Sequence, residues 1–477
     1  MENTKVIKLL KSFNQNEIKQ FRDFVNSPVF NKKEILIRVT EELKKHYPEF
    51  SKDKLGEEKF FGEIFPGENY NYFKLKNTLS DLFMLGKEFL AFNRFRNDEM
   101  VKERYILDEC RLRNLMTFFK NELKTADDRI EKLPVKDEIY FFRKLELTLQ
   151  ELSFLVPQTP NKHLHFQQKM LDLFLNYSII KIFRSYNVMM HEEKQNNVEY
   201  EKHLLNEIMS FVEESKIENP TMQIYYHIIS LERNHNDDNF HKLKEAGSKY
   251  KDDISVYDSY MVFLHLNGYC TNEFNINTRT DLFKEQFELV RDKDSRDYTS
   301  LGKLLYPDFI SEIKISLRYN QIEWAEDYIV RNTQRLSSDA ESAVNFCNAM
   351  INVKKGNPDK ALELLSKTNF PNFIIKLQVK ILELQIYFDK EYFDQVSSAI
   401  DNFRHYLKRE NTIKENFKDS FYEFVNILNA LIKLNTGYYG NEKDFYIDKI
   451  RNEIEIMTTN QFGIKLWLRE KADYLSS

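Results

Sequence analysis

Two lines of amide side chains are the residues of this sequence whose types and spacing best fit contact with another molecule. The segment VNFCNAMINVKKG, residues 344–356, has a counterpart in VNILNALIKLNTG, residues 425–437, which begins 81 positions later. Residues three or four apart share one face of a helix, so the polar residues of each segment form one continuous line. The line consists of Asn345, Asn348 and Asn352 in the first segment and of Asn426, Asn429 and Lys433 in the second, and Gln378 and Gln385 continue it between them.

These amides have three interpretations: they line a peptide-binding groove, form a hydrated strip, or pair with one another between helices. A carboxamide donates and accepts a hydrogen bond at once, as the backbone of an extended peptide requires. Asn is a poorer helix former than Glu or Lys by a few tenths of a kcal/mol, so a purely exposed strip gains nothing from it. Each net hydrogen bond contributes about 1 kcal/mol, whereas micromolar binding needs about 8 kcal/mol. Buried aromatic side chains would therefore have to supply most of the affinity.

Patterns of catalytic or metal-binding residues are weak in this sequence. His163 and His165 stand two positions apart, which splays their rings on a helix, and no further ligand follows in a metal-site pattern. Ser178 and Lys181 have the spacing of one class of nucleophile but lack the partner motifs of that class. Cys347 falls on the apolar face of its helix, where a small core residue is the ordinary role. We therefore expect a protein that is not an enzyme and that has no cofactor and no metal site.

Composition restricts the fold and the partners. The chain of 477 residues is too long for one ordinary core, and its 11 glycines and 10 prolines are too few for the turns of an all-β protein. Mixed charges with a net charge of −5 predict neither duplex DNA nor an anionic membrane as partner. Three dispersed cysteines fit a reducing compartment, and no apolar run reaches the roughly 18 residues of a membrane span. We expect a cytoplasmic protein without a membrane partner.

The first 97 residues are expected to form an N-terminal helical domain. Asn14 with Glu17 and Asn31 with Glu34 have the spacing of a capping box. A helix break is expected at Asn97, with Asp98 as the next cap. The predicted helices lie near residues 4–11, 15–25, 32–46, 54–64 and 71–95.

Residues 98–159 are expected to be connecting helices, and residues 160–477 are expected to be stacked helix pairs. The predicted turns lie near residues 191–197, 234–239, 267–277, 320, 356, 390 and 437. Spacings of roughly 35 to 45 residues are typical of helical solenoids, in which one pair cannot bury its apolar faces without its neighbours. The predicted fold is all-α, with the N-terminal helical domain followed by an α-solenoid of antiparallel helix pairs.

The segment KKGNPDKALELLSKTNFP, residues 354–371, resembles the turn and second helix of a tetratricopeptide repeat. Gly356 stands in the turn and Ala361 at the small position five residues later. Ala325 and Val396 occupy the equivalent place 36 residues before and 35 residues after Ala361, close to the family's period of about 34. The first helices lack the family's Trp and Leu-Gly. The resemblance implies that residues 160–477 are a tetratricopeptide-like array that binds peptides on its concave face.

These observations lead to two hypotheses. In the first, the protein is a non-enzymatic scaffold or adaptor that binds a protein or an extended peptide in the concave groove of a helical repeat array. In the second, it is a ligand- or peptide-sensing regulator whose N-terminal domain contacts nucleic acid. Acidic neighbours dilute the basic stretch that would serve this contact, so a salt-bridged helix face is expected instead of a nucleic-acid partner. The stretch contains Arg94, Arg96, Lys102, Arg104, Arg111, Arg113 and Lys120.

Overall fold

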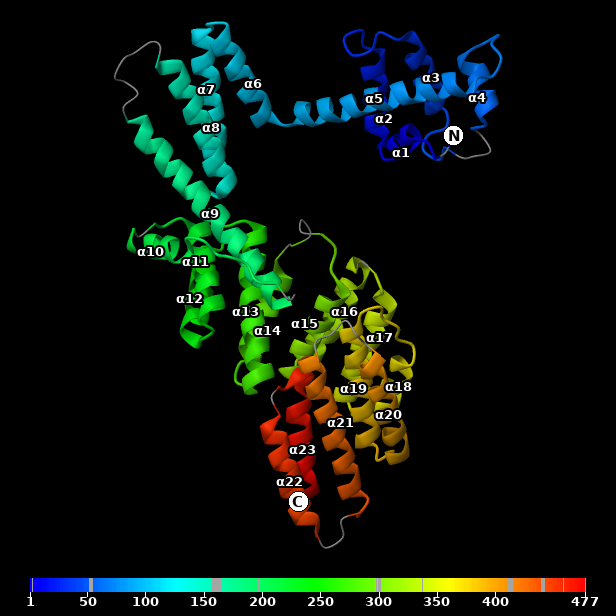
Figure 1. Ribbon diagram of the computed structural model, residues 1–477, viewed down its shortest axis with the longest axis vertical. Helices are drawn as coiled ribbons and strands as arrows, with labels where there is room; N and C mark the ends of the chain where they lie inside the picture. The colour runs from blue at the N-terminus through cyan, green and yellow to red at the C-terminus, as the bar shows by residue number, and fades with distance from the viewer. Residues whose placement is uncertain are drawn as a thin grey trace. The chain divides into compact units, whose positions relative to one another are not determined.

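The computed structural model describes most of the chain (Figure 1). The described residues are 1, 3–50, 55–156, 165–195, 198–215, 217–296, 298, 302–336, 338–409, 415–438, 442–457 and 459–476. Within them every regular element is a helix, and the only β-type contact is an isolated bridge between Leu304 and Leu336. This confirms the all-α prediction.

The helices of the N-terminal half follow the predicted pattern. They are α1 (Lys5–Lys11), α2 (Gln15–Asn26), α3 (Glu34–Lys44), α4 (Glu57–Ile64), α5 (Tyr72–Asn97), α6 (Glu99–Leu112), α7 (Met116–Glu131), α8 (Glu138–Leu155), α9 (Phe166–Gln195), α10 (Leu205–Glu214) and α11 (Pro220–Arg233).

The C-terminal half continues in the same way and includes the short 3-10 helix η4. Its elements are α12 (Asp237–Lys249), α13 (Val256–Asn277), α14 (Phe283–Ser295), α15 (Tyr306–Arg318), α16 (Ile322–Asn332), α17 (Ala340–Lys354), α18 (Pro358–Leu365), α19 (Phe373–Asp389), α20 (Phe393–Arg409), α21 (Glu415–Asn435), α22 (Lys443–Ile456), η4 (Gln461–Gly463) and α23 (Ile464–Ser476).

The chain divides into two compact units. The first consists of Met1–Lys132 and Arg143–Leu171, and the second of Leu133–Phe142 and Asp172–Ser477. Helices α8 and α9 therefore each carry residues of both units. Residue 97, where the sequence places a boundary, is the last residue of α5 and lies inside the first unit. The second expected boundary, at residue 159, falls outside the described residues.

Side-chain caps begin α2, α5 and α6 of the first unit. Asn14 and Glu17 form the predicted capping box, and the side chain of Asp98 accepts a hydrogen bond from the backbone N–H of Val101. The prediction for Asn31 and Glu34 was wrong. The Asn31 side chain is buried and bonds the backbone of Val25 and Lys33 instead, because satisfying these buried groups outweighs an exposed cap.

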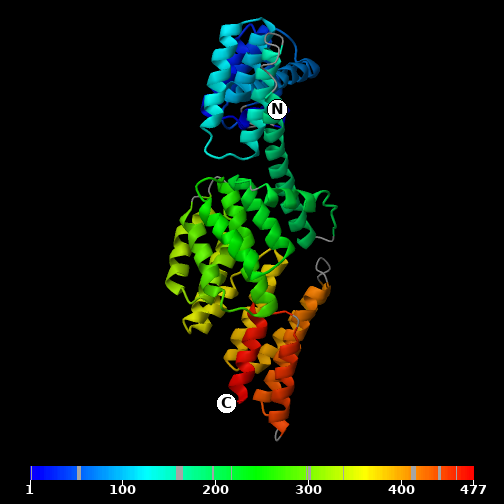
Figure 2. The same cartoon turned by 90° about the vertical axis from the view of Figure 1, so that its left-hand side faces the viewer.

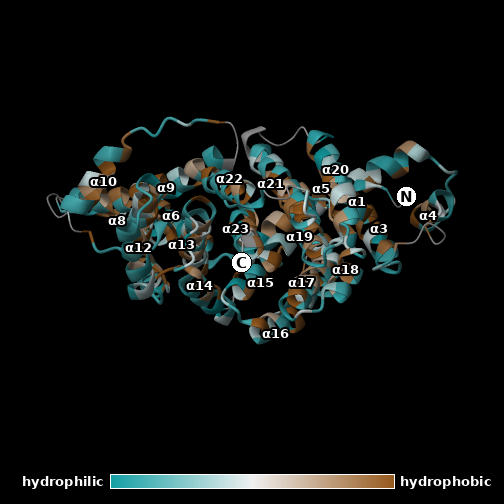
Figure 3. Cartoon of the chain, turned by 90° about the horizontal axis from the view of Figure 1, so that it is seen from below, coloured by the Kyte–Doolittle hydropathy of each residue, from teal (hydrophilic) through white to brown (hydrophobic). Residues whose placement is uncertain are grey.

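The second unit is built by successive packing. From α11 to α23 every helix packs against the next one along the chain, and α11 with α13, α15 with α17, α17 with α19 and α21 with α23 also touch. Figures 1 and 2 show these helices following one another from green to red, and Figure 3 shows stretches of hydrophobic residues on α17 and α19. Val396, Ile400, Phe403 and Leu407, which are spaced three or four positions apart along α20, are all buried.

The turns predicted near residues 320, 356, 390 and 437 are present and share one backbone geometry. Asn320, Gly356, Glu391 and Gly437 have φ of 58°, 75°, 58° and 70°. In the second of them, the N–H of Asn357 donates to the carbonyl of Asn352 over 2.8 Å, and equivalent bonds close the other three. This is the closure of a Schellman motif, which favours glycine at the left-handed position. The turn Gly of the two related segments is thus required by φ.

Glu391 is therefore a strained position in this set, and replacing it tests that reading. We expect Glu391→Gly to raise the free energy of unfolding by about 1 kcal/mol, since a non-glycine residue in the left-handed region costs that much. Glu391→Ala keeps the strain and serves as the control. Urea unfolding followed by the fluorescence of Trp324 and Trp467 measures both; equal stabilities of the two variants would contradict the strain.

The turn predicted within residues 267–277 was wrong. Helix α13 continues through Gly268 to Asn277. Leu266, Tyr269, Cys270 and Phe274 are all buried on this stretch, and burial of that apolar face outweighs the roughly 1 kcal/mol that one helical glycine costs.

Candidate functional site

The predicted amide residues all lie on helices of the second unit. Asn345, Asn348 and Asn352 are on α17, Gln378 and Gln385 on α19, and Asn426, Asn429 and Lys433 on α21. Asn426 and Lys433 are exposed, and the other six side chains are half-buried. The contacts α15–α17 and α17–α19 bring the first two groups into one neighbourhood.

Hydrogen bonds distinguish these amides from one another. Gln378 accepts from the Nζ of Lys314 on α15 over 2.8 Å, and Asn426 accepts from Arg404 over 2.8 Å. Asn352 donates to the carbonyl of Asn348 in its own helix. Among the described residues no hydrogen bond joins two of these amides across helices, so internal amide pairing gains no support here. The groove and the hydrated strip remain as interpretations.

A groove that sequence reasoning missed lies between α9, α11 and α13. It has a volume of about 850 Å³. Its apolar part includes Val188, Tyr257 and Leu264, which are 49%, 43% and 37% exposed. Gly268 also lines it, and a Cβ added there would meet no atom within 4 Å. The groove therefore combines uncovered apolar surface with free space.

Polar and charged side chains surround this apolar surface. Glu232 bonds the Nδ1 of His265 over 2.7 Å and also pairs with Lys194. Burial alone would raise the pKa of Glu232, but its bonds to His265 and Lys194 outweigh burial and lower the pKa to about 2. The amide of Asn187 approaches the sulfur of Met261 at 3.8 Å, and its Oδ1 has no hydrogen-bond partner in the described structure. This carboxamide acceptor is thus buried and unsatisfied in the wall of the groove.

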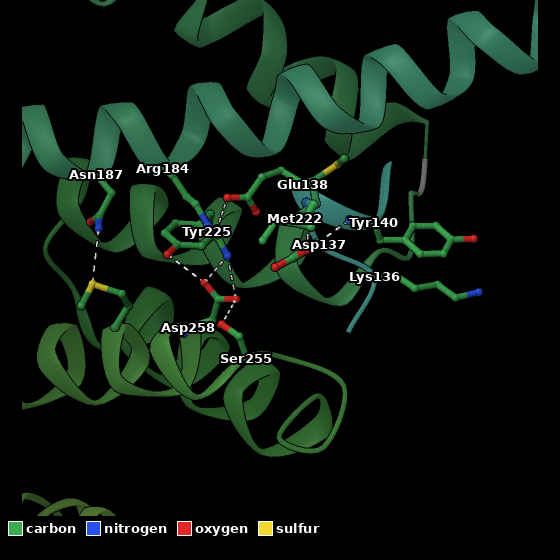
Figure 4. Close-up of polar contacts among 12 residues, drawn as sticks. Lys136, Asp137, Glu138, Tyr140, Arg184, Asn187, Met222, Tyr225, Ser255 and Asp258 are labelled. Carbon is green, nitrogen blue, oxygen red and sulfur yellow. Dashed lines mark hydrogen bonds and ion pairs between the residues drawn. The ribbon is translucent and has the colours of Figure 1, made fainter. Parts of the chain in front are cut away.

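A buried ionic cluster fixes the three helices that line the groove (Figure 4). Arg184 on α9 donates to both carboxylate oxygens of Asp258 on α13, over 2.7 and 2.9 Å, and also to Glu138 at the start of α8. Tyr225 on α11 and Ser255 donate to the same carboxylate over 2.9 and 2.7 Å. Asp258 is fully buried. Because Arg184 is one turn before Val188 and Asp258 adjoins Tyr257, the cluster holds the groove walls in register.

The separation of these residues in the chain explains why the groove was missed. Val188, Glu232 and Leu264 come from three helices, and no local motif joins them. The sequence contains one signal for the groove. Tyr257 and Leu264 are apolar, yet they lie on a different face of α13 from the buried residues Leu266 and Cys270.

The residues considered for catalysis or metal binding do not assemble into a site. Cys347 is fully buried, and burial raises the pKa of its thiol. His163 lies outside the described residues, and His165 is exposed. In the described ranges no three His, Cys, Asp or Glu side chains gather as metal ligands.

The basic stretch of the first unit is largely engaged by carboxylates. Lys102 pairs with Glu99, Arg104 with Glu146, Arg111 with Asp108 and Arg113 with Glu109. Four of the seven basic side chains are thus neutralised locally, which favours the salt-bridged helix face over a nucleic-acid contact.

Comparison of the chain with protein-family models, with curated proteins and with solved structures found no match. Nor does any helix in the described residues have the length and apolar character needed to cross a membrane.

Proposed function

We propose that this protein is a non-enzymatic scaffold or adaptor, in which the helices of the second unit form a tetratricopeptide-like repeat array that binds an extended segment of a partner protein. The groove between α9, α11 and α13 carries the proposal. Its exposed Val188, Tyr257 and Leu264 offer the apolar area that affinity requires. Peptide sites combine such area with a few polar groups that fix orientation, here Asn272 and His235.

The amide lines on α17 and α19 extend this proposal along the array. The half-buried Asn345, Asn348 and Gln385 make no side-chain hydrogen bond within the described chain, so their donors and acceptors are free for a peptide backbone. A partner bound in the groove would use these amides for register and the apolar residues for most of its binding free energy.

Filling the groove tests the proposal without disturbing the fold. Gly268→Met places a side chain in open space and replaces a helical glycine, so we expect unchanged or higher thermal stability. Peptides selected on the intact protein from a random display library should bind this variant at least about tenfold more weakly, a difference of about 1.4 kcal/mol. Fluorescence anisotropy with labelled peptides measures the affinity.

The control is Gly62→Met on α4 of the first unit, another exposed helical glycine with no atom within 4 Å of an added Cβ. Its peptide affinity should equal that of the unmodified protein. Peptides that bind Gly268→Met at full strength would remove the groove from the proposal. The variant with Ala at Asn345, Asn348, Asn426 and Asn429, read in the same assay, should lose affinity if the amides contact the peptide.

A further inference from the structure

Two basic side chains on α15 have no anionic partner in the part of the chain that the structure describes. Lys314 and Arg318 lie one helical turn apart. Lys314 donates to Gln378 over 2.8 Å and lies 4.7 Å from the ring centroid of Phe462, while the Arg318 guanidinium lies 4.1 Å from the ring centroid of Phe274. Neither forms an ion pair with a carboxylate among the described residues.

On the opposite face of the same helix, a buried charge has both a partner of opposite charge and a hydrogen bond. There Glu312 pairs with Lys293 and accepts a hydrogen bond from Tyr328. On the Lys314 side, burial lowers the pKa of Lys314 well below its ordinary value, and the charge of Arg318 lowers it further. Burial also lowers the pKa of Arg318 to about 10. Keeping both groups protonated therefore costs free energy in the protein, since their lost hydration is not replaced.

The aromatic rings beside these cations are held by specific contacts. Phe274 is in the last turn of α13, and Phe462 is in η4. Asn460, just before η4, is fully buried; its N–H donates to the carbonyl of Asn275 over 2.5 Å and its Nδ2 to that of Phe274 over 3.3 Å. Both rings are thus placed in fixed positions against the cations. A ring below a guanidinium leaves the N–H groups in the guanidinium plane free to donate.

The two head groups are deep but not sealed. Both residues are half-buried, and none of their nitrogen atoms is among the fully buried polar atoms that lack a partner. Lys314 and Arg318 thus lie below the surface, keep N–H donors that are free and can still be reached by a ligand. A structural ion pair differs from them because its donors are already occupied by a carboxylate.

We propose that Lys314 and Arg318 form a binding site for an oxyanion, a carboxylate or phosphate group of a small ligand. The planar guanidinium presents two parallel donors that match two oxygens of such a group, and the ammonium adds a compact charge beside it. The Nε2 of Gln378, whose Oε1 is taken by Lys314, supplies a further donor. The groove between α9, α11 and α13 is lined by other residues, so this site does not depend on it; Gln378 is the one amide of the α17 and α19 lines that the site shares.

The test uses full-length protein and inorganic phosphate or acetate in place of chloride at equal ionic strength. Thermal unfolding is followed by the fluorescence of Trp324 and Trp467, both in the second unit. Phosphate also stabilises proteins by exclusion from their surface, so the informative quantity is the difference between variants. Arg318→Gln and Lys314→Met remove the site, and Lys354→Gln removes one positive charge from an exposed position on α17.

We expect the anion to raise the midpoint temperature of the unmodified protein and of Lys354→Gln more than that of Arg318→Gln or Lys314→Met. In chloride, the two site variants should unfold at a higher temperature than the unmodified protein, because the unpaired charge is gone. A response to phosphate alone or to acetate alone assigns the class of oxyanion. Equal responses of all four proteins to both anions would overturn the proposal, and so would site variants that are less stable in chloride yet keep the full response.

Discussion

Asp258→Ala should lower the free energy of unfolding of the second unit by about 3 to 5 kcal/mol, the usual result of removing one partner of a buried ion pair. Arg184 remains buried and keeps only Glu138, while Tyr225 and Ser255 lose their acceptor. Burial by itself would lower the pKa of Arg184, and the attraction of Asp258 and Glu138 outweighs burial and raises it. Asp258→Ala removes the larger part of this attraction and leaves the burial of Arg184 uncompensated.

Urea unfolding followed by tryptophan fluorescence measures this loss. Asp327→Ala is the matched control, because Asp327 pairs with Arg331 over 2.6 Å at the surface, with 62% and 43% of the two side chains exposed. An exposed pair contributes at most about 1 kcal/mol. If the two variants lose equal stability, the cluster beneath the groove has no special structural role. Since the cluster joins α9, α11 and α13, Asp258→Ala should also weaken peptide binding in the groove.

Lys293→Met should destabilise the second unit by a similar amount, about 3 to 5 kcal/mol near pH 8, and by less near pH 5. The Glu312 side chain is 4% exposed and would lose Lys293, the one cation that pairs with it among the described residues. Burial already raises the pKa of Glu312 above its ordinary value, although Lys293 and Tyr328 oppose the rise. Without Lys293 this pKa rises further.

The sign of the pH dependence follows from proton binding. Between the pKa of Glu312 in the unfolded chain and its higher pKa in the folded protein, the folded state binds more protons. The free energy of unfolding therefore falls as pH rises through this window, and Lys293→Met extends the window upward. Urea unfolding at pH 5 and pH 8 measures the difference. The double variant Lys293→Met with Glu312→Leu should regain stability at pH 8, because an apolar pair replaces the lone charge. If Lys293→Met lost the same stability at pH 5 and at pH 8, the charge of Glu312 would not be the cause of that loss.

Much of the helical framework could be predicted because its signals are local. The capping box of Asn14 with Glu17, the cap at Asp98 and the turns at Gly356 and Gly437 each depend on neighbours within one helical turn. The wrong predictions also relied on local signals, and at those positions tertiary contacts outweighed the local signal. The side chain of Asn31 bonds buried backbone groups of its loop and does not cap the helix. Helix α13 continues through Gly268 because neighbouring helices cover the apolar face of α13.

The candidate sites show the same division. The amide residues were placed on helices α17, α19 and α21 as their spacing predicts. The unpaired cations had a weak signal that could have been found, since Lys314 and Arg318 have no acidic residue three or four positions away. That Lys314 faces Phe462 and Arg318 faces Phe274, 148 and 44 positions away in the chain, could not have been found from spacing.

The sequence by itself determined that the chain is helical, where most of its helices end and which residues share a helix face, because these properties depend on contacts within a few residues. Only the tertiary structure decided which faces are covered. Val188, Tyr257 and Leu264 are left open between α9, α11 and α13, and within the described ranges Lys314 and Arg318 are left without a carboxylate. The physical reason is that burial and charge pairing are set by distance in space, and the partners concerned come from helices far apart in the chain.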